Sequence, residues 1–265
     1  MLRSMCAGDS FALSLRGEKE DVEAITAQSL YDHYRKVLET SPVHVFYVGA
    51  EEAETVAQYL RPMLSRLAKE PMELPPQTGF VPGDYMEKEE ILDVAQGKLC
   101  MGFATPVNLR DPRYAAVQVC NTILGAGMTS KLFVQLREKR SLCYAVGSGY
   151  YSSKGLMTVH AGIDSSRLEE TKTGVLEQLK ACQNGEISPQ ELENAKAAVL
   201  SGLRAVYDSP GAMENFFSTG ALSGLDRTPE RYADEIRAVT LHDVVEAANT
   251  VCFHSSFFLK GENHG

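Results

Sequence analysis

The sequence predicts an α+β fold whose complete unit occupies residues 90–265. Two observations support this prediction. Segments with the period-2 alternation of strands are interleaved there with segments that have the apolar spacing of amphipathic helices. The end of the chain also repeats, in the same order, a helix and a strand that occur near its beginning.

Composition places limits on the class of protein. The 265 residues are 44% hydrophobic, which is enough to bury a substantial core in one or two domains. The net charge of −9 leaves no basic surplus to neutralise phosphates, so it argues against nonspecific nucleic-acid binding. The start of the chain has no apolar core of signal-peptide length, and no apolar run reaches 18 residues. We therefore expect a soluble, cytoplasmic protein that binds neither nucleic acid nor membrane.

The cysteines indicate a reducing environment. The chain has 6 of them, and no two form a CxxC pair. Most lie in apolar or periodic segments, which favours buried, reduced thiols over a disulfide framework.

The first part of the chain contains two predicted helices around one predicted strand. Residues 22–40 and 51–68 have helical apolar spacing, and "SPVHVFYVG" between them reads as a strand that is apolar on both faces. Such a strand is expected to be covered on both sides. Residues 69–89 contain four prolines and two glycines, so we interpret them as an interdomain linker.

The predicted unit after the linker combines strands and helices. The strand pattern occurs in "VAQGKLCMGFAT", and "CYAVGSGYYS" followed by "GLMTVHAGI" predicts a hairpin. A serine at an N-cap, a proline at N1 and a glutamate at N3 mark one helix start at Ser188. The predicted helices are 112–124, 129–140, 166–182, one that begins after Ser188, 212–223 and 229–238, the last capped by Thr228.

The internal repeat relates Thr26 to Thr240, an offset of 240 − 26 = 214 residues. In both places a threonine N-cap precedes a helix, a short connector, an apolar strand and a glycine. We therefore expect residues 1–68 to be the C-terminal remnant of a first repeat and residues 90–265 to be a complete second repeat. By this interpretation the sequence is a fragment of a longer protein.

Several common active-site motifs are absent from the sequence. None of the 6 histidines belongs to HExxH or HxxEH, so the chain has no zinc-peptidase helix and we expect it to bind no metal. There is no GxSxG motif. "GAGMTSK" lacks the spacing of a phosphate-binding loop, and a helix end followed by a new helix N-cap explains it better.

The remaining candidate lies in "LREKRSLCY". Arg137 supplies forked N–H donors and Tyr144, seven residues later, supplies one directed O–H. Together they could bind a peptide carbonyl, or the oxyanion that forms when water attacks it. The alternative is that Arg137 pairs with a neighbouring acid and Tyr144 fills the core. Residue pattern alone leaves both readings open and favours the second.

A family resemblance rests on the segment around this candidate. "GAGMTSKLFVQLREKRSLCYAVGSGY" resembles the C-terminal-repeat signature of the insulinase/pitrilysin-type peptidases, which include the mitochondrial processing peptidases. The resemblance covers roughly residues 90–262, and residues 20–67 resemble the tail of a preceding repeat. It continues through "GLMTVHAGIDSSRLEET", "GEISPQELENAKAAVLSGL" and "DSPGAMENFFSTGALSG".

The resemblance implies a fold and a division of labour. It implies tandem α+β domains, each an antiparallel sheet backed by helices, in two halves that close around a peptide. One half carries HxxEH and zinc, and the other contributes an arginine and a tyrosine that bind substrate near the scissile carbonyl. Arg137 and Tyr144 match that pair, whereas Glu138, Lys139 and Arg140 are expected to be solvated charges at a helix end.

Because this chain lacks the zinc motif, we expect it to be inactive alone. The resemblance implies the zinc-less subunit of a heterodimer, whose partner is an HxxEH insulinase-type subunit that supplies the zinc. Two alternatives stay open. The chain could be a non-catalytic structural or peptide-binding scaffold, or the zinc motif could lie in a first repeat outside this sequence.

Overall fold

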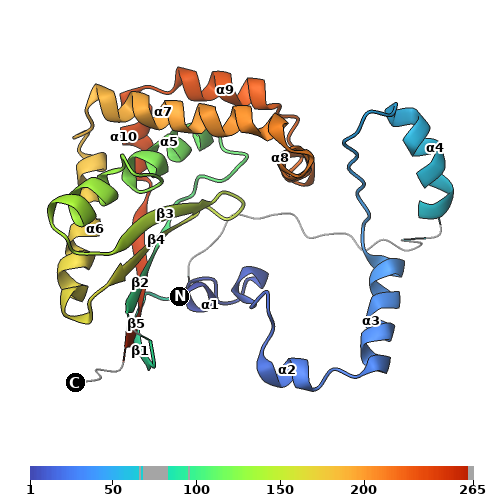
Figure 1. The fold of residues 1–265 in the computed structure, drawn as a ribbon, viewed down its shortest axis with the longest axis horizontal. Helices are drawn as coiled ribbons and strands as arrows, with labels where there is room; N and C mark the ends of the chain where they lie inside the picture. The colour runs from blue at the N-terminus through green and yellow to red at the C-terminus, as the bar shows by residue number, and fades with distance from the viewer. Residues whose placement is uncertain (66, 68–82, 95, 262–265) are drawn as a thin grey trace.

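A computed structural model describes residues 1–65, 67, 83–94 and 96–261. Its main body is one five-stranded sheet in the order β1-β5-β2-β4-β3, with a layer of helices on one face (Figure 1). The predicted fold class, α+β with a sheet backed by helices, is confirmed. The strands are β1 (Met86–Leu92), β2 (Gly97–Ala104), β3 (Ala145–Tyr151), β4 (Leu156–Ile163) and β5 (Cys252–Gly261).

The helical layer is formed by residues between 114 and 249. The helices of this body are α5 (Tyr114–Leu124), α6 (Leu168–Gln183), α7 (Pro189–Arg204), α8 (Pro210–Leu222), α9 (Pro229–Ala238) and α10 (Leu241–Asn249). Short helical segments are η2 (Phe133–Lys139), η3 (Ser165–Arg167) and η4 (Ala205–Asp208). Helix α5 contacts α7, α9, α10 and α6, so it is the central helix of the layer.

The sheet is mixed, not purely antiparallel as the resemblance implied. β2 pairs antiparallel with β4 and with β5, and β3 pairs antiparallel with β4, which confirms the predicted hairpin. β1 instead runs parallel to β5. A short connection reverses the chain between β1 and β2, so these two strands run in opposite directions. β5 lies between them, antiparallel to β2 and therefore parallel to β1.

The core lies between the sheet and the helical layer. Strand alternation directs Leu99, Met101 and Phe103 of β2 toward the helices, and all three are buried. Met157 and Val159 of β4 belong to the same apolar cluster. Each fully buried side chain of this size contributes about 1.5–3 kcal/mol through the hydrophobic effect.

Helix starts agree with the cap residues in the sequence. Ser188 and Glu191 form a reciprocal capping box at the start of α7, and Thr228 caps α9. Thr26 and Thr240, the two threonines related by the 214-residue offset, each form a capping box at a helix start. The predicted caps are confirmed. They could be predicted because capping depends on residues within one turn of the helix start.

The N-terminal segment packs on the open face of the sheet. Helix α1 (Leu2–Met5) and the turn η1 (Ser10–Ala12) form a second apolar cluster with β4. Gly102 of β2 has no side chain, and the sulfurs of Met1 and Met5 occupy the space where its Cβ would be. Lys154 Nζ pairs with Asp9 Oδ2 at 2.7 Å and holds the segment at its far end.

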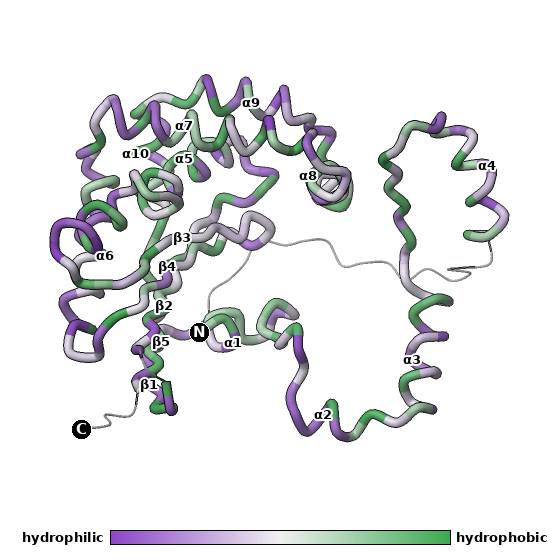
Figure 2. Tube along the Cα trace, viewed as in Figure 1, coloured by the Kyte–Doolittle hydropathy of each residue, from purple (hydrophilic) through white to green (hydrophobic). Residues whose placement is uncertain are grey.

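The next segment leaves the main body. Helices α2 (Lys19–Glu23), α3 (Ala27–Thr40) and α4 (Ala53–Leu64) contain no buried residue (Figure 1). Figure 2 shows apolar stretches along this part of the chain. The exposed large apolar side chains here include Val22, Ile25, Leu30, Tyr31, Tyr34, Val37, Val43, Val45, Tyr47, Tyr59 and Met63.

The strand predicted within "SPVHVFYVG" is wrong in this structure. Residues 42–48 have no regular secondary structure and pair with no strand in the described part of the chain. A strand needs a neighbour that accepts and donates its backbone hydrogen bonds, and no described segment lies in that position. The apolar residues of this segment fit a strand, but no described strand pairs with it.

The predicted linker of residues 69–89 overlaps β1 at Met86–Glu89. Residues 68–82 lie outside the described residues, as does most of the predicted linker. β1 has the sequence MEKEEIL and is exposed along nearly all its length, so it shows neither the apolar alternation nor the turn residues that predict a strand.

Four of the cysteines are buried free thiols: Cys6, Cys120, Cys143 and Cys182. Cys100 is partly buried and Cys252 is exposed. The expectation of mostly buried, reduced thiols is confirmed, with Cys252 as the exception. Among the described helices, none combines the length and the apolar character required to span a bilayer.

Candidate functional site

Arg137 lies in an unusual helical segment. η2 is a π-helix, in which each backbone hydrogen bond joins residues five positions apart and not four as in an α-helix. Such segments are rare overall, but those that occur are often at functional sites. The sequence predicted an ordinary helix over residues 129–140. The guanidinium of Arg137 lies over the ring of Phe133, 4.7 Å from its centroid, and Nε is 3.8 Å from Glu138 Oε1.

Ser141 turns the chain from η2 toward the sheet. It has a φ of 50°, the one positive φ at a non-glycine residue among the described residues. This conformation lets the N–H of Leu142 donate back to the carbonyl of Leu136 at 2.8 Å, and both leucines are buried. The turn therefore fixes the path of the chain between Arg137 and Tyr144.

Tyr144 is anchored by its backbone and leaves its side chain free. Its N–H donates to the carbonyl of Gly162 at 2.8 Å, and β3 begins at the next residue, opposite Gly162. The side chain is exposed. In the described part of the chain the phenolic hydroxyl has no hydrogen-bond partner.

Arg137 and Tyr144 line the same cavity. This cavity has a volume of about 630 Å³ and is open to solvent. The Arg137 side chain is 43% exposed. Tyr144 is 59% exposed, so it does not fill the core, and the pairing of Arg137 with Glu138 is long. The residues that line the cavity are Arg137, Glu138, Ser141, Leu142, Cys143, Tyr144, Asp164, Ser166 and Arg167.

The charges that follow Arg137 have different surroundings. Glu138, Lys139 and Arg140 are all exposed at the end of η2, as expected. Arg140 also has a structural role, because its Nη1 lies 2.8 Å from Glu177 Oε2 and its Nη2 lies 3.6 Å from Glu170 Oε1. These ion pairs join the end of η2 to α6.

Part of the cavity lining comes from the turn after β4, which contributes Asp164, Ser166 and Arg167. Asp164 caps η3 by accepting hydrogen bonds from the backbone and the side chain of Ser166. These bonds lower the pKa of Asp164 below its usual value. Burial raises the pKa of the Cys143 thiol, while the nearby Arg137 acts in the opposite direction. Sequence reasoning missed this part of the lining, although the predicted hairpin already places the end of β4 beside Tyr144.

No metal site accompanies the pair in the described residues. No group of three His, Cys, Asp or Glu side chains is arranged there to hold an ion. His242 lies 3.7 Å from Glu246, one turn along the exposed face of α10. The described residues therefore offer no ligand set that fits a zinc ion.

Comparison with known protein families shows the family to which the chain belongs. The model of the family described as "Peptidase M16 inactive domain" matches residues 24–199. The chain belongs to the peptidase M16 family. The predicted insulinase-type resemblance is confirmed, and the chain contains an inactive M16 peptidase-like domain.

Two sequences from Bacillus subtilis are similar to this chain. A protein of Bacillus subtilis called "Probable inactive metalloprotease YmfF" is 29% identical over 268 residues, covering 98% of this chain and 61% of the relative. The "Uncharacterized zinc protease YmxG" of the same bacterium is 28% identical over 155 residues, covering 57% of this chain and 38% of the relative.

Solved structures agree on the fold. A conserved protein from Enterococcus faecalis V583 superposes with a TM-score of 0.84 at 28% identity, covering 100% of this chain and 63% of that one. A peptidase M16 inactive domain from Pseudomonas fluorescens has a TM-score of 0.77 at 18% identity, covering 98% and 64%, and shows the fold alone. The chain therefore spans about three fifths of the length of these relatives.

Proposed function

We propose that this M16 chain is the zinc-less half of a heteromeric peptidase, and that Arg137 and Tyr144 bind the backbone of a peptide held between the two halves. The observation that carries this proposal is that both side chains line one cavity of about 630 Å³. The guanidinium and the phenolic hydroxyl are both hydrogen-bond donors. A peptide carbonyl oxygen accepts two hydrogen bonds, so one oxygen can receive both.

The two donors gain importance if the carbonyl becomes an oxyanion. Negative charge on the oxygen strengthens hydrogen bonds from preorganised donors, and removal of one such donor typically lowers the rate about 10²–10³-fold. Arg137 is held by Phe133, and Tyr144 is fixed by its backbone bond to Gly162. The side-chain contact of Arg137 and the backbone hydrogen bond of Tyr144 both support preorganisation of the pair.

An edge strand beside the cavity also supports peptide binding. One of its backbone groups is already engaged, because the N–H of Ser148 donates to the carbonyl of Gly125 at 3.0 Å, so a peptide would add along the rest of the strand. β3 is an edge strand of the sheet and begins directly after Tyr144. An extended peptide can add to such an edge through main-chain hydrogen bonds, largely without regard to its sequence. Gly147 and Gly149 leave the open face of this strand without bulky side chains.

The partner in this proposal is an M16 subunit with an HxxEH motif. Zinc bound there would supply the activated water for hydrolysis. Within this chain, we propose that residues 1–68 are the end of a first repeat, that residues 69–89 link the repeats, and that residues 90–265 form the second. The cytoplasmic location stays a prediction.

Reconstitution with a zinc-bearing M16 subunit tests the proposal. We expect Arg137→Ala and Tyr144→Phe each to reduce kcat for peptide hydrolysis by about 10²–10³-fold. Arg237→Ala and Tyr207→Phe are matched controls, because these exposed residues pair only with Asp234 and Glu230 on α9. They should leave kcat unchanged.

Two results would count against this function. If neither Arg137→Ala nor Tyr144→Phe alters turnover in an active complex, the pair does not assist hydrolysis. If no zinc-bearing M16 subunit forms a complex with the chain, but the chain still binds extended peptides, the scaffold interpretation replaces the peptidase one.

A further inference from the structure

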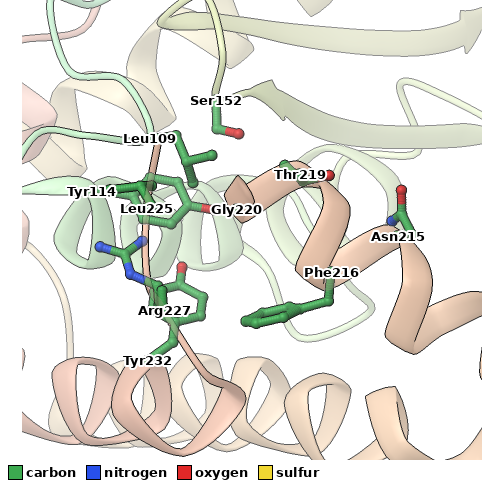
Figure 3. A pocket seen from close by; sticks show the side chains of 10 residues that line it. All are labelled: Leu109, Tyr114, Ser152, Asn215, Phe216, Thr219, Gly220, Leu225, Arg227 and Tyr232. Carbon is green, nitrogen blue, oxygen red and sulfur yellow. The ribbon is translucent and has the colours of Figure 1, made fainter. Parts of the chain in front are cut away.

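A second pocket lies between α8, α9 and the loop that follows β2. It has a volume of about 160 Å³ and shares no residue with the cavity around Arg137 (Figure 3). Apolar walls come from Leu109, Phe216 and Leu225. Its lining residues are Leu109, Tyr114, Ser152, Asn215, Phe216, Thr219, Gly220, Leu225, Arg227 and Tyr232.

The C-terminal turn of α8 builds one wall. Gly224 has a φ of +66°, so the chain reverses there and the N–H of Leu225 donates to the carbonyl of Gly220 at 2.9 Å. Arg110 Nε donates to the carbonyl of Ser223 at 2.6 Å and holds the turn against the loop after β2. The side chain of Leu225 is thereby brought to the pocket.

Three aromatic and cationic groups form the polar end of the pocket. The rings of Tyr114 and Tyr232 are stacked with centroids 5.3 Å apart. The guanidinium of Arg227 lies 5.2 Å from the first ring centroid and 5.0 Å from the second. Figure 3 shows the guanidinium beside both rings, with the Tyr232 hydroxyl directed toward Tyr114.

Two hydrogen-bond donors at this end have no acceptor. In the described part of the chain, Arg227 Nη1 and Tyr232 Oη are buried and lack a hydrogen-bond partner. Arg227 Nη2 pairs with Glu235 at 3.1 Å, which partly neutralises the guanidinium and leaves the N–H groups of Nη1 to donate to another acceptor. Burial raises the pKa of Tyr232, and the neighbouring Tyr114 hydroxyl acts in the same direction, although the two hydroxyls do not have the geometry of a hydrogen bond. The Tyr232 hydroxyl therefore stays protonated and can donate.

Buried donors without acceptors are rare and are usually satisfied by a bound ligand, an ion or an ordered water. A carboxylate accepts hydrogen bonds and has two oxygens, one for each of these donors. A phosphate would direct further oxygens toward Leu109, Phe216 and Leu225, whose side chains cannot bond them. A cavity of about 150 Å³ with apolar walls accommodates one benzene ring.

We propose that this pocket binds a small carboxylate attached to a ring or a branched apolar group, with Arg227 and Tyr232 on the carboxylate and the apolar walls around the remainder. Benzoate has the required size and charge. The same chemistry occurs at the C-terminus of a peptide that ends in phenylalanine. This site is independent of the peptide groove around Arg137.

NMR titration of the full chain with benzoate tests the proposal. Benzoate is expected to shift backbone signals around Gly220 and Leu225, whereas benzyl alcohol, which lacks the carboxylate, should bind at least about tenfold more weakly. A hydrogen bond to a charged group is worth about one order of magnitude or more in affinity. Tyr232→Phe and Arg227→Lys should each weaken benzoate binding by about that factor, and thermal unfolding checks that both variants fold.

Matched variants and ligands sharpen the result. Tyr207→Phe and Arg237→Lys, which lie outside the pocket, should leave benzoate affinity unchanged. Binding of N-acetylphenylalanine but not of its amide would assign the site to peptide C-termini as well as free acids. Binding of benzoate alone would restrict it to free acids. The proposal is overturned if benzoate does not bind, if benzyl alcohol binds equally well, or if the two pocket variants bind benzoate as the wild type does.

Discussion

Lys131 Nζ lies 2.8 Å from Glu191 Oε1, and this ion pair joins the start of η2 to the N-terminus of α7. The Lys131 side chain is only 9% exposed, and its Nζ also donates to the carbonyl of Glu186 at 2.6 Å. Neither residue lines the cavity, and the pair helps to fix the helical segment that carries Arg137.

Glu191→Gln should make the stability of the fold less dependent on pH. Burial raises the pKa of Glu191, but hydrogen bonds from Lys131 and Ser188 outweigh it and leave the pKa below 4.5. The stabilisation is therefore present above pH 4.5 and lost as pH falls through the lower, folded-state pKa. Glutamine can still form the capping box, so the substitution removes mainly the charge.

Denaturant unfolding from pH 3 to pH 7 measures this effect. We expect Glu191→Gln to lower the free energy of unfolding at pH 7 by roughly 1.5–3 kcal/mol, and we expect this difference to shrink as the pH is lowered toward 3. Glu193→Gln, on an exposed side chain, is the control. An equal loss at both pH values would contradict the assigned pKa shift.

Ser141→Gly should stabilise the protein, whereas Ser141→Val should destabilise it. A φ of 50° costs an L-residue roughly 1–2 kcal/mol, and glycine adopts it freely. Because glycine also loses more entropy on folding, the net gain should be about 0.5–1 kcal/mol. Chemical denaturation followed by circular dichroism measures both variants. A stability of Ser141→Val equal to that of the wild type would show that this turn is not strained.

Gly155→Ala should destabilise the β3–β4 hairpin by several kcal/mol. Gly155 has a φ of +66°, and a Cβ there would collide with the carbonyl oxygens of Thr105 and Val107, which are backbone atoms and cannot move cheaply. Gly8 also has a positive φ, but open space surrounds it. Gly8→Ala should therefore cost only about 1 kcal/mol in thermal unfolding. Equal costs for the two variants would exclude the steric explanation.

Helices α3 and α10 should differ in hydrogen exchange by several orders of magnitude. Both begin with a threonine capping box, but α10 buries Val244, Ala247 and Ala248, while α3 buries nothing. A helix without tertiary contacts opens at almost no cost, whereas a core helix opens only with much of the fold. Amide exchange in a monomeric sample measures the difference. Comparable protection would mean that α3 is packed in solution, for example through self-association.

Local sequence predicted the helices of the second half well. Ser188, Thr228 and Thr240 define helix starts through bonds within one turn, so no tertiary information is needed. The hairpin was predictable because alternation and turn residues are also local. The strand β1 was not, since its pairing with β5 depends on a segment more than 160 residues away and its side chains are charged on both faces.

The candidate site was only partly predictable. Spacing and family resemblance indicated Arg137 and Tyr144, but the π-helix and the positive φ of Ser141 that direct them have no recognisable pattern in the sequence. The pocket at Arg227 and Tyr232 was not predicted either. It depends on the stacking of Tyr114 from α5 on Tyr232 from α9, which only the packed helices reveal.

A double-mutant cycle on kcat/KM tests the central claim most directly, using the chain reconstituted with a zinc-bearing M16 subunit. Arg137→Ala, Tyr144→Phe and the double variant are compared with the wild type. If both donors bind one peptide oxygen, their effects are coupled, and the double variant should lose about 0.5–3 kcal/mol less than the sum of the single losses. Strictly additive losses, or no loss in either single variant, would show that Arg137 and Tyr144 do not act on the same group.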